Sequence, residues 1–139
     1  MTHKRTKPVS PERLPALLRA MPKAELHMHI EGSLEADMIF AMGQRNKVPL
    51  AYPSIEALRQ AYVFDNLQSF LDIYHAGTTV LKTEQDFYDM TDAYLARAQA
   101  DNVLHTEIFF DTQTHTGHGT SVETVINGLH RACADAPAR

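Results

Sequence analysis

Cysteine is nearly absent from this sequence, which contains only Cys133. A single thiol cannot form an internal disulfide bond, and its isolation excludes the cysteine clusters that hold structural zinc. We therefore expect a protein of a reducing compartment.

The sequence also lacks an excess of positive charge and any long apolar run. Lys and Arg number 13 against 17 Asp and Glu, the formal net charge is -4, and the isoelectric point is near 6.0. Nucleic acids and anionic membranes attract concentrated positive charge, so neither is expected as a partner. The basic residues at positions 3–7 are not followed by an apolar stretch that could form a signal sequence or a membrane span. We expect a cytoplasmic protein that acts on a small molecule.

What is present is the composition of an ordinary globular domain, with 44% hydrophobic and 22% charged residues. Residues 24–30 alternate in polarity and predict a β-strand. Residues 103–110 are rich in β-branched and aromatic side chains and predict a second strand, apolar enough for burial on both faces. Helical spacing of apolar residues marks 11–18, 34–46, 55–62, 67–82, 84–98 and 122–129, while 112–119 is expected to be a loop. The expected N-caps are Ser10, Ser33, Ser54, Asp65 or Asn66, Thr83 with Asp86 in a capping box, and Thr120 or Ser121.

The order of these elements predicts an α/β fold with parallel strands and right-handed crossovers. Two strands leave both sheet edges unpaired, so the chain looks like the opening of a larger unit. A (β/α)8 TIM barrel, at about 250 residues, would be roughly twice as long. We expect a lead-in helix in residues 1–21 and, in residues 22–139, the truncated N-terminal portion of such a barrel with about two of its strands.

Two histidines at the end of the first predicted strand are candidate metal ligands. His27 and His29 are two residues apart and would share one face of the strand with Glu25. Such a polar row inside a sheet needs partners or a metal, and imidazole suits zinc, although no third ligand is evident. A hydrogen-bonded core pair, or a pair at the exposed end of the sheet, would explain the spacing equally well. The position just before a βα turn, where barrel enzymes gather catalytic groups, favours a functional role.

A different zinc motif is excluded. His29-Ile30-Glu31 matches the H-x-E half of the cytidine deaminase signature, but that signature also needs P-C-x-x-C, which a chain with one cysteine cannot supply.

The stretch 22–35, Pro-Lys-Ala-Glu-Leu-His-Met-His-Ile-Glu-Gly-Ser-Leu-Glu, resembles the first-strand motif of the adenosine and adenine deaminase family, P-K-x-E-L-H-x-H-(x)-(D/E)-G. The resemblance continues through residues 67–74 and 107–116 and covers the N-terminal half of the family. It implies a zinc-dependent (β/α)8 barrel that hydrolyses the 6-amino group of a purine and releases ammonia.

The resemblance also implies roles for single residues. His27 and His29 match zinc ligands, and His29, Glu31, Leu67, Phe70 and Tyr74 match the substrate site. The helical stripe that holds Leu67, Phe70 and Tyr74 would equally suit a core. The family's catalytic glutamate and its remaining zinc ligands come from later strands, so no catalytic residue is assigned within this chain.

Glu31 bears on the substrate. Nucleoside-acting members of the family usually carry aspartate there, which holds a ribose hydroxyl, whereas adenine-acting members usually carry glutamate. We expect the longer side chain to favour adenine, which would become hypoxanthine in purine metabolism. Thr112 stands where the adenine-acting branch commonly has proline. The alternatives are an adenosine deaminase of the same fold, or a non-catalytic fragment whose partner is a complementary C-terminal half.

Overall fold

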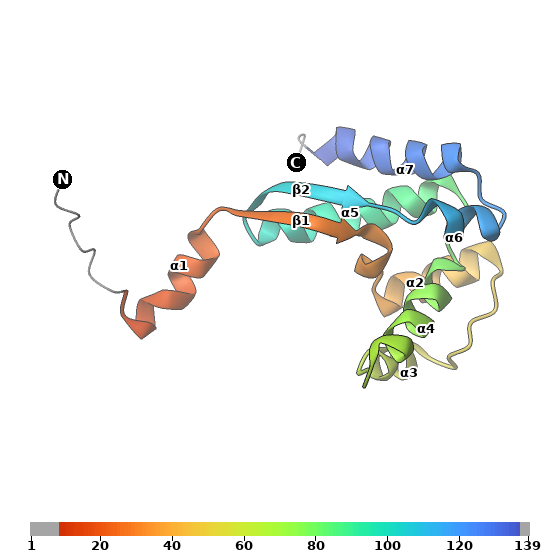
Figure 1. The fold of residues 1–139 in the computed structure, drawn as a ribbon, viewed down its shortest axis with the longest axis horizontal. Coiled ribbons are helices and arrows are strands. Elements are labelled where there is room, and N and C mark those ends of the chain that lie inside the picture. Colours follow the sequence, from red (N-terminus) through yellow and green to blue (C-terminus); the bar gives the residue numbers. More distant parts are fainter. Residues whose placement is uncertain (1–8, 137–139) are drawn as a thin grey trace.

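The computed structural model describes residues 9–136, in which two strands lie side by side against a layer of helices (Figure 1). The basic residues at 3–7 therefore lie outside the described residues. The elements in chain order are η1 (Pro11–Arg13), α1 (Leu14–Ala20), β1 (Lys23–His29), η2 (Ile30–Ser33), α2 (Ala36–Asn46), α3 (Ile55–Ala61), α4 (Leu67–Thr78), α5 (Glu84–Ala100), β2 (Val103–Phe109), α6 (Thr112–Gly117) and α7 (Val122–Asp135).

Four helices begin at capping residues that the sequence predicts. Ser54, Asn66, Thr83 and Ser121 each accept a hydrogen bond from a backbone N–H of the first helical turn. The capping box of Thr83 with Asp86 is present, although Asp replaces the usual Glu.

One predicted cap lacks its capping bond and another is wrong. Ser10 occupies the N-cap position of the 3₁₀ turn η1 and Pro11 follows it as predicted, but the Ser10 side chain makes no capping hydrogen bond. Ser33 lies within a second 3₁₀ turn, where its hydroxyl donates to the Ile30 carbonyl at 2.7 Å, and α2 begins after Glu35 instead. The tight turn η2 takes up residues that helical periodicity alone would assign to the following helix.

β1 and β2 form a parallel pair, as predicted. The pairing is irregular, because Glu25 is opposite Thr106 whereas Met28 is opposite Ile108. Three steps along β1 therefore match two along β2, which is the count of a β-bulge.

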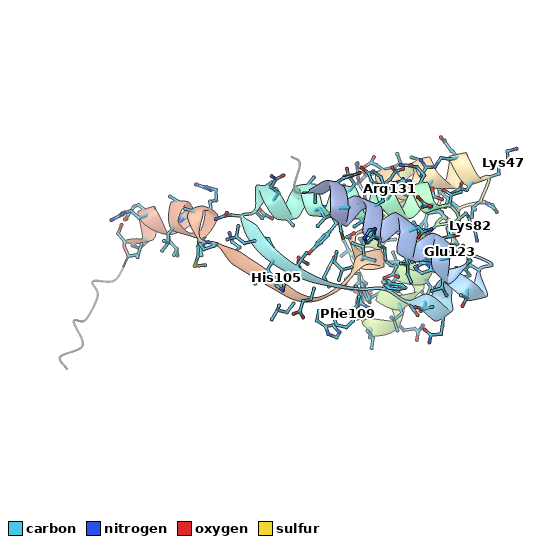
Figure 2. All side chains as sticks on the ribbon, turned by 90° about the horizontal axis from the view of Figure 1, so that it is seen from above. Lys47, Lys82, His105, Phe109, Glu123 and Arg131 are labelled. Carbon is cyan, nitrogen blue, oxygen red and sulfur yellow. The ribbon has the colours of Figure 1, made fainter. Side chains whose placement is uncertain are left out.

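The helices cover only one face of this sheet. Met28, Ile108 and Phe110 pack towards the core that α5 and α7 help to form. On β2, Leu104 is 74% exposed and Phe109 42% exposed, and Figure 2 shows Phe109 and His105 on the side away from those helices. The expectation that β2 is buried on both faces is wrong for these residues, because nothing in the described part of the chain covers the second face.

The apolar core lies between the sheet, η2 and the helices. Its most deeply buried side chains are Ile30, Val80, Leu81, Phe87, Met90 and Val125. Helix α1 stands apart from this body (Figure 1), and Leu14, Leu17 and Leu18 on it are each 45–46% exposed. None of the helices in residues 9–136 is long and apolar enough to cross a membrane.

Candidate metal and substrate site

His27 and His29 converge at the carboxyl end of β1. Their Nε2 atoms are 3.2 Å apart and their ring centroids 5.1 Å apart, and both residues are exposed. Phe109, at the end of β2, supports the pair, because the His27 ring stacks on its ring with centroids 4.3 Å apart. The two imidazoles thus point at the same space above the end of the sheet.

The bulge in β1 falls on His27, whose φ of 68° lies in the left-handed region. Few residues other than glycine adopt this conformation without strain. The bulge also changes which residues share a face: Glu25 and Met28 are partly buried, while Leu26, His27 and His29 are exposed. The expectation that Glu25 shares a face with the histidines is therefore wrong, because strict alternation ends at the bulge.

The histidine pair fits two ligands of a zinc ion. Zn–N bonds of about 2.0–2.1 Å in tetrahedral coordination place two ligand nitrogens about 3.3 Å apart, close to the 3.2 Å between the Nε2 atoms. The same distance also suits a hydrogen bond between the rings, with one Nε2 protonated. No cluster of three or more His, Cys, Asp or Glu suited to a metal occurs within residues 9–136, so the described chain offers two ligands and no third.

Glu31 is buried beside the histidines, with 3% of its surface exposed. Its Oε1 accepts from the Asp111 backbone N–H at 2.7 Å and from His115 Nε2 at 2.8 Å, and its Oε2 accepts from the Tyr74 hydroxyl at 3.1 Å. Burial acts to raise the pKa of Glu31, but the hydrogen bonds from His115 and the Asp111 backbone outweigh it and hold the pKa below its ordinary value. The carboxylate thus joins η2 to α4 and to the start of α6.

A pocket of about 490 Å³ opens next to His29. It is lined by Met28, His29, Gly32, Phe70, Leu71, Tyr74, His75 and Asp111. His29, Phe70 and Tyr74 are among the residues that the sequence assigns to a substrate site, and the fold brings these three together. Glu31 supports the wall through Tyr74 rather than lining it. Leu67, at the start of α4, is 71% exposed and is not part of the lining.

Two polar groups at the pocket have shifted acidities. Burial, and next the nearby Glu31 carboxylate, raise the pKa of the Tyr74 hydroxyl, which therefore stays protonated and donates. Asp111 caps α6, and its hydrogen bonds from Thr114 lower the pKa of its carboxyl group.

Sequence reasoning missed Asp111, His75 and the role of His115. Asp111 follows directly on β2, and that position at the carboxyl end of a barrel strand could have identified it. His115 is fully buried, and its ring contacts Glu31 and Phe87. No spacing in the sequence indicates a contact between residues 84 positions apart.

Comparison with known proteins gives a consistent result. Residues 22–139 match the family described as adenosine deaminase. The chain is 75% identical over 130 residues to an adenine deaminase of Albidiferax ferrireducens. The matched region covers 94% of this chain and 38% of that relative. It is 68% identical over 119 residues to an adenine deaminase of Trichlorobacter lovleyi, covering 86% of this chain and 34% of that protein. The chain therefore spans little more than a third of these relatives.

Two solved structures resemble the fold. The adenine deaminase of Arthrobacter aurescens superposes with a TM-score of 0.82 at 53% identity, covering 86% of this chain and 36% of its own. An amidohydrolase of Burkholderia ambifaria, solved with bound Zn, gives a TM-score of 0.70 at 27% identity over 96% of this chain and 38% of its own. These likenesses confirm the predicted class, an α/β fold that forms the N-terminal portion of a (β/α)8 barrel with two of its strands.

Proposed function

Because the chain belongs to the adenosine deaminase family, we propose that it supplies part of the active site of a zinc-dependent adenine deaminase. The reaction adds water to C6 of adenine and expels the 6-amino group, giving hypoxanthine and ammonia. The adenine deaminases that resemble the chain at 53–75% identity support this choice of substrate. Since those relatives extend well beyond the matched region, which is little more than a third of their length, we assign the activity to the chain together with the remaining C-terminal part of such a protein.

The observation that carries this proposal is the convergence of the two Nε2 atoms at 3.2 Å beside the pocket. His27 and His29 would hold the zinc ion through these nitrogens. Zinc bound there would act as a Lewis acid and make water nucleophilic near neutral pH. The catalytic acid would come from outside residues 9–136, as would the remaining ligands.

The chain's own residues would bind and orient the base. His29 belongs to both the histidine pair and the pocket lining, so a base in the pocket would lie next to the metal. Phe70 and Leu71 supply apolar wall that excludes water from the reacting carbon. Tyr74, on the same helix and fixed by its hydrogen bond to Glu31, would hold the adjoining part of that wall in place.

The length of the Glu31 side chain supports adenine, and not adenosine, as the substrate. Its side chain reaches three donors, on α4, just after β2 and on α6, and a side chain one methylene shorter could not reach all of them from the same backbone position. In this proposal the longer residue keeps the pocket closed where a ribose would need space.

A chimeric enzyme tests the proposal. In it, this chain replaces the matching 130-residue segment of the Albidiferax ferrireducens relative, and ammonia release is measured with adenine and with adenosine. We expect a higher kcat/KM for adenine, loss of turnover on chelation of zinc, and restoration on adding zinc back. His29→Ala should remove both zinc and turnover. A higher kcat/KM for adenosine would show that the substrate assignment is wrong, and Glu31→Asp should move the ratio in that direction.

The 139-residue chain alone is the matched control. We expect it to release no ammonia from adenine, with or without zinc, because no catalytic acid is assigned within it. Turnover by the chain alone would mean that a second copy, or another residue of this chain, completes the site.

A further inference from the structure

Glu25 is a charged residue of β1 that faces the helices instead of the histidine site. The hydroxyl of Tyr94, on α5, donates to Glu25 Oε2 at 2.5 Å and lies 2.6 Å from the hydroxyl oxygen of Thr106 on β2. Because the Tyr94 proton goes to the carboxylate, the Thr106 hydroxyl is the donor in the second bond. These bonds tie β1, α5 and β2 together under the sheet.

This placement inverts the polarity expected of a strand. Leu26, which is apolar, is 63% exposed, whereas Glu25 beside it turns towards the core where Tyr94 is only 5% exposed. Turning Leu26 inward in line with Met28 and Ile30 would bury apolar surface. Glu25 is half-buried, and the Tyr94 hydroxyl satisfies its carboxylate on this side, as a charge partly removed from water requires.

The bulge lies between two residues of β1 that both face inward. In a regular strand, residues 25 and 28 face opposite sides, since neighbouring side chains alternate. Here Glu25 and Met28 both face inward, while their partners Thr106 and Ile108 are only two positions apart. One residue too many lies between the two fixed points, and His27 takes it up at a φ of 68°.

The two histidine rings beside the bulge lie close together. Side chains two positions apart on a regular strand stand roughly parallel, about 6.6 Å from each other. The rings of His27 and His29 are closer than this, with centroids 5.1 Å apart and Nε2 atoms 3.2 Å apart. The close approach of the rings coincides with the left-handed backbone of His27.

We infer that Glu25, held by Tyr94, is a positioning residue for the zinc site, which keeps the bulge at His27 and so makes the two imidazoles converge. This inference rests on the proposed function for its zinc, but the link between Glu25 and the backbone of His27 does not. Glu25 touches no reacting atom and acts through the strand.

Conservative variants of the chimera test the inference. Glu25→Gln keeps an oxygen that accepts from Tyr94, whereas Glu25→Ala and Tyr94→Phe remove one side of the bond. Zinc affinity is measured by competition with a chromogenic chelator. We expect Glu25→Ala and Tyr94→Phe to weaken zinc binding about 10-fold or more, the effect typical of losing a partner that orients a ligand. Glu25→Gln should stay close to the parent enzyme.

Tyr88→Phe is the matched control, since it removes a hydroxyl from the same helix whose bond goes to Asp135 instead. The inference is overturned if Tyr88→Phe weakens zinc binding as much as Tyr94→Phe, or if Glu25→Ala leaves the affinity unchanged. A crystal structure of the Tyr94→Phe chimera gives an independent readout. We expect His27 to return to a negative φ and the Nε2 atoms to separate.

The structural readout also separates the two proposals. A parent chimera that binds no zinc would contradict the proposed function. In that case the conformation of His27 in the Tyr94→Phe variant still decides the inference, because a bulge that persists without the Tyr94 hydroxyl rejects it.

Discussion

Asp86 is a fully buried carboxylate on which the start of α5 depends. It accepts hydrogen bonds from the guanidinium of Arg45, from the Asn46 side chain at 2.8 Å, and from the backbone N–H groups of Lys82 at 3.0 Å and Thr83 at 2.7 Å. Burial acts to raise the pKa of Asp86, but the hydrogen bonds from Arg45 and Thr83 outweigh it, so the pKa lies below its ordinary value.

Asp86→Asn should therefore destabilise the fold by about 2–3 kcal/mol at neutral pH, because Arg45 and the capping N–H groups lose a charged acceptor. A lowered folded-state pKa means that this stabilisation is complete above the unfolded value of about 3.9 and is lost as the pH falls through the folded value. The difference in unfolding free energy between parent and variant chimera, measured in urea, should narrow only below about pH 4.

Asp89→Asn provides the comparison for this prediction. Asp89 accepts from the same Arg45 at 2.8 Å, but its side chain is 32% exposed and water can replace the bond. We expect a loss of less than about 1 kcal/mol. Equal losses at the two positions would mean that burial of Asp86 contributes nothing.

Local contacts of such residues are readable from sequence, but distant ones are not. The spacing of Thr83 and Asp86 predicts the capping box, because both partners lie in one helical turn. Arg45, 41 positions earlier, carries no sign of its pairing with Asp86. Glu31 likewise stands out as part of a motif, whereas its partner His115 becomes evident only when β2 and α6 are in place.

Helices α5 and α7 approach each other so closely at Gly128 that no side chain fits between them there. A Cβ atom added at Gly128 of α7 would lie 2.5 Å from the Glu84 carbonyl oxygen and 2.6 Å from the Phe87 Cβ. Both atoms belong to α5 and cannot move without the helix. Glycine is therefore required at this position by the approach of the helices.

Gly128→Ala should destabilise the chimera by about 1–3 kcal/mol, as overpacking does elsewhere, although alanine is the better helix former. Gly117→Ala, at the end of α6, is the matched substitution, because nothing lies within 4 Å of an added Cβ there. It should leave the thermal midpoint unchanged or slightly raised. A similar decrease in the thermal midpoint of both variants would show that the close α5–α7 contact is not the reason why glycine is required at position 128.

At the level of elements, periodicity predicts those whose apolar residues repeat and misses those fixed by single contacts. The helices α2, α4, α5 and α7 and the strand β1 follow from such repeats, and β2 follows from its β-branched and aromatic content. The sequence predicts a loop where helix α6, Thr112–Gly117, forms, because α6 has no apolar stripe; the Asp111 cap and buried His115 hold it. The bulge at His27 could not be predicted, because the alternation of polar and apolar residues gives no information about the hydrogen bond between Glu25 and the distant Tyr94.

One face of the sheet is left uncovered by the residues that the structure describes, as expected if the two strands belong to a larger parallel sheet. Leu104, at 74% exposure, and Leu26, at 63%, are apolar residues of a parallel sheet, and parallel sheets are normally covered on both faces. The resemblance to longer barrel proteins, of which this chain spans little more than a third, explains why cover is missing within residues 9–136.

The substitution Leu104→Lys should have different effects on the stability of the isolated chain and of the chimera. In the isolated 139-residue chain, the side chain is in water already, so we expect a change in unfolding free energy of less than about 0.5 kcal/mol. In the chimera, residues beyond this chain should cover the position, and a buried unpaired lysine should cost several times as much. Urea unfolding of the chain and the chimera, each with and without the substitution, measures both effects. If the two losses were equal, Leu104 would remain exposed in the larger protein, and the open side of the sheet would not be the surface on which the rest of the barrel packs.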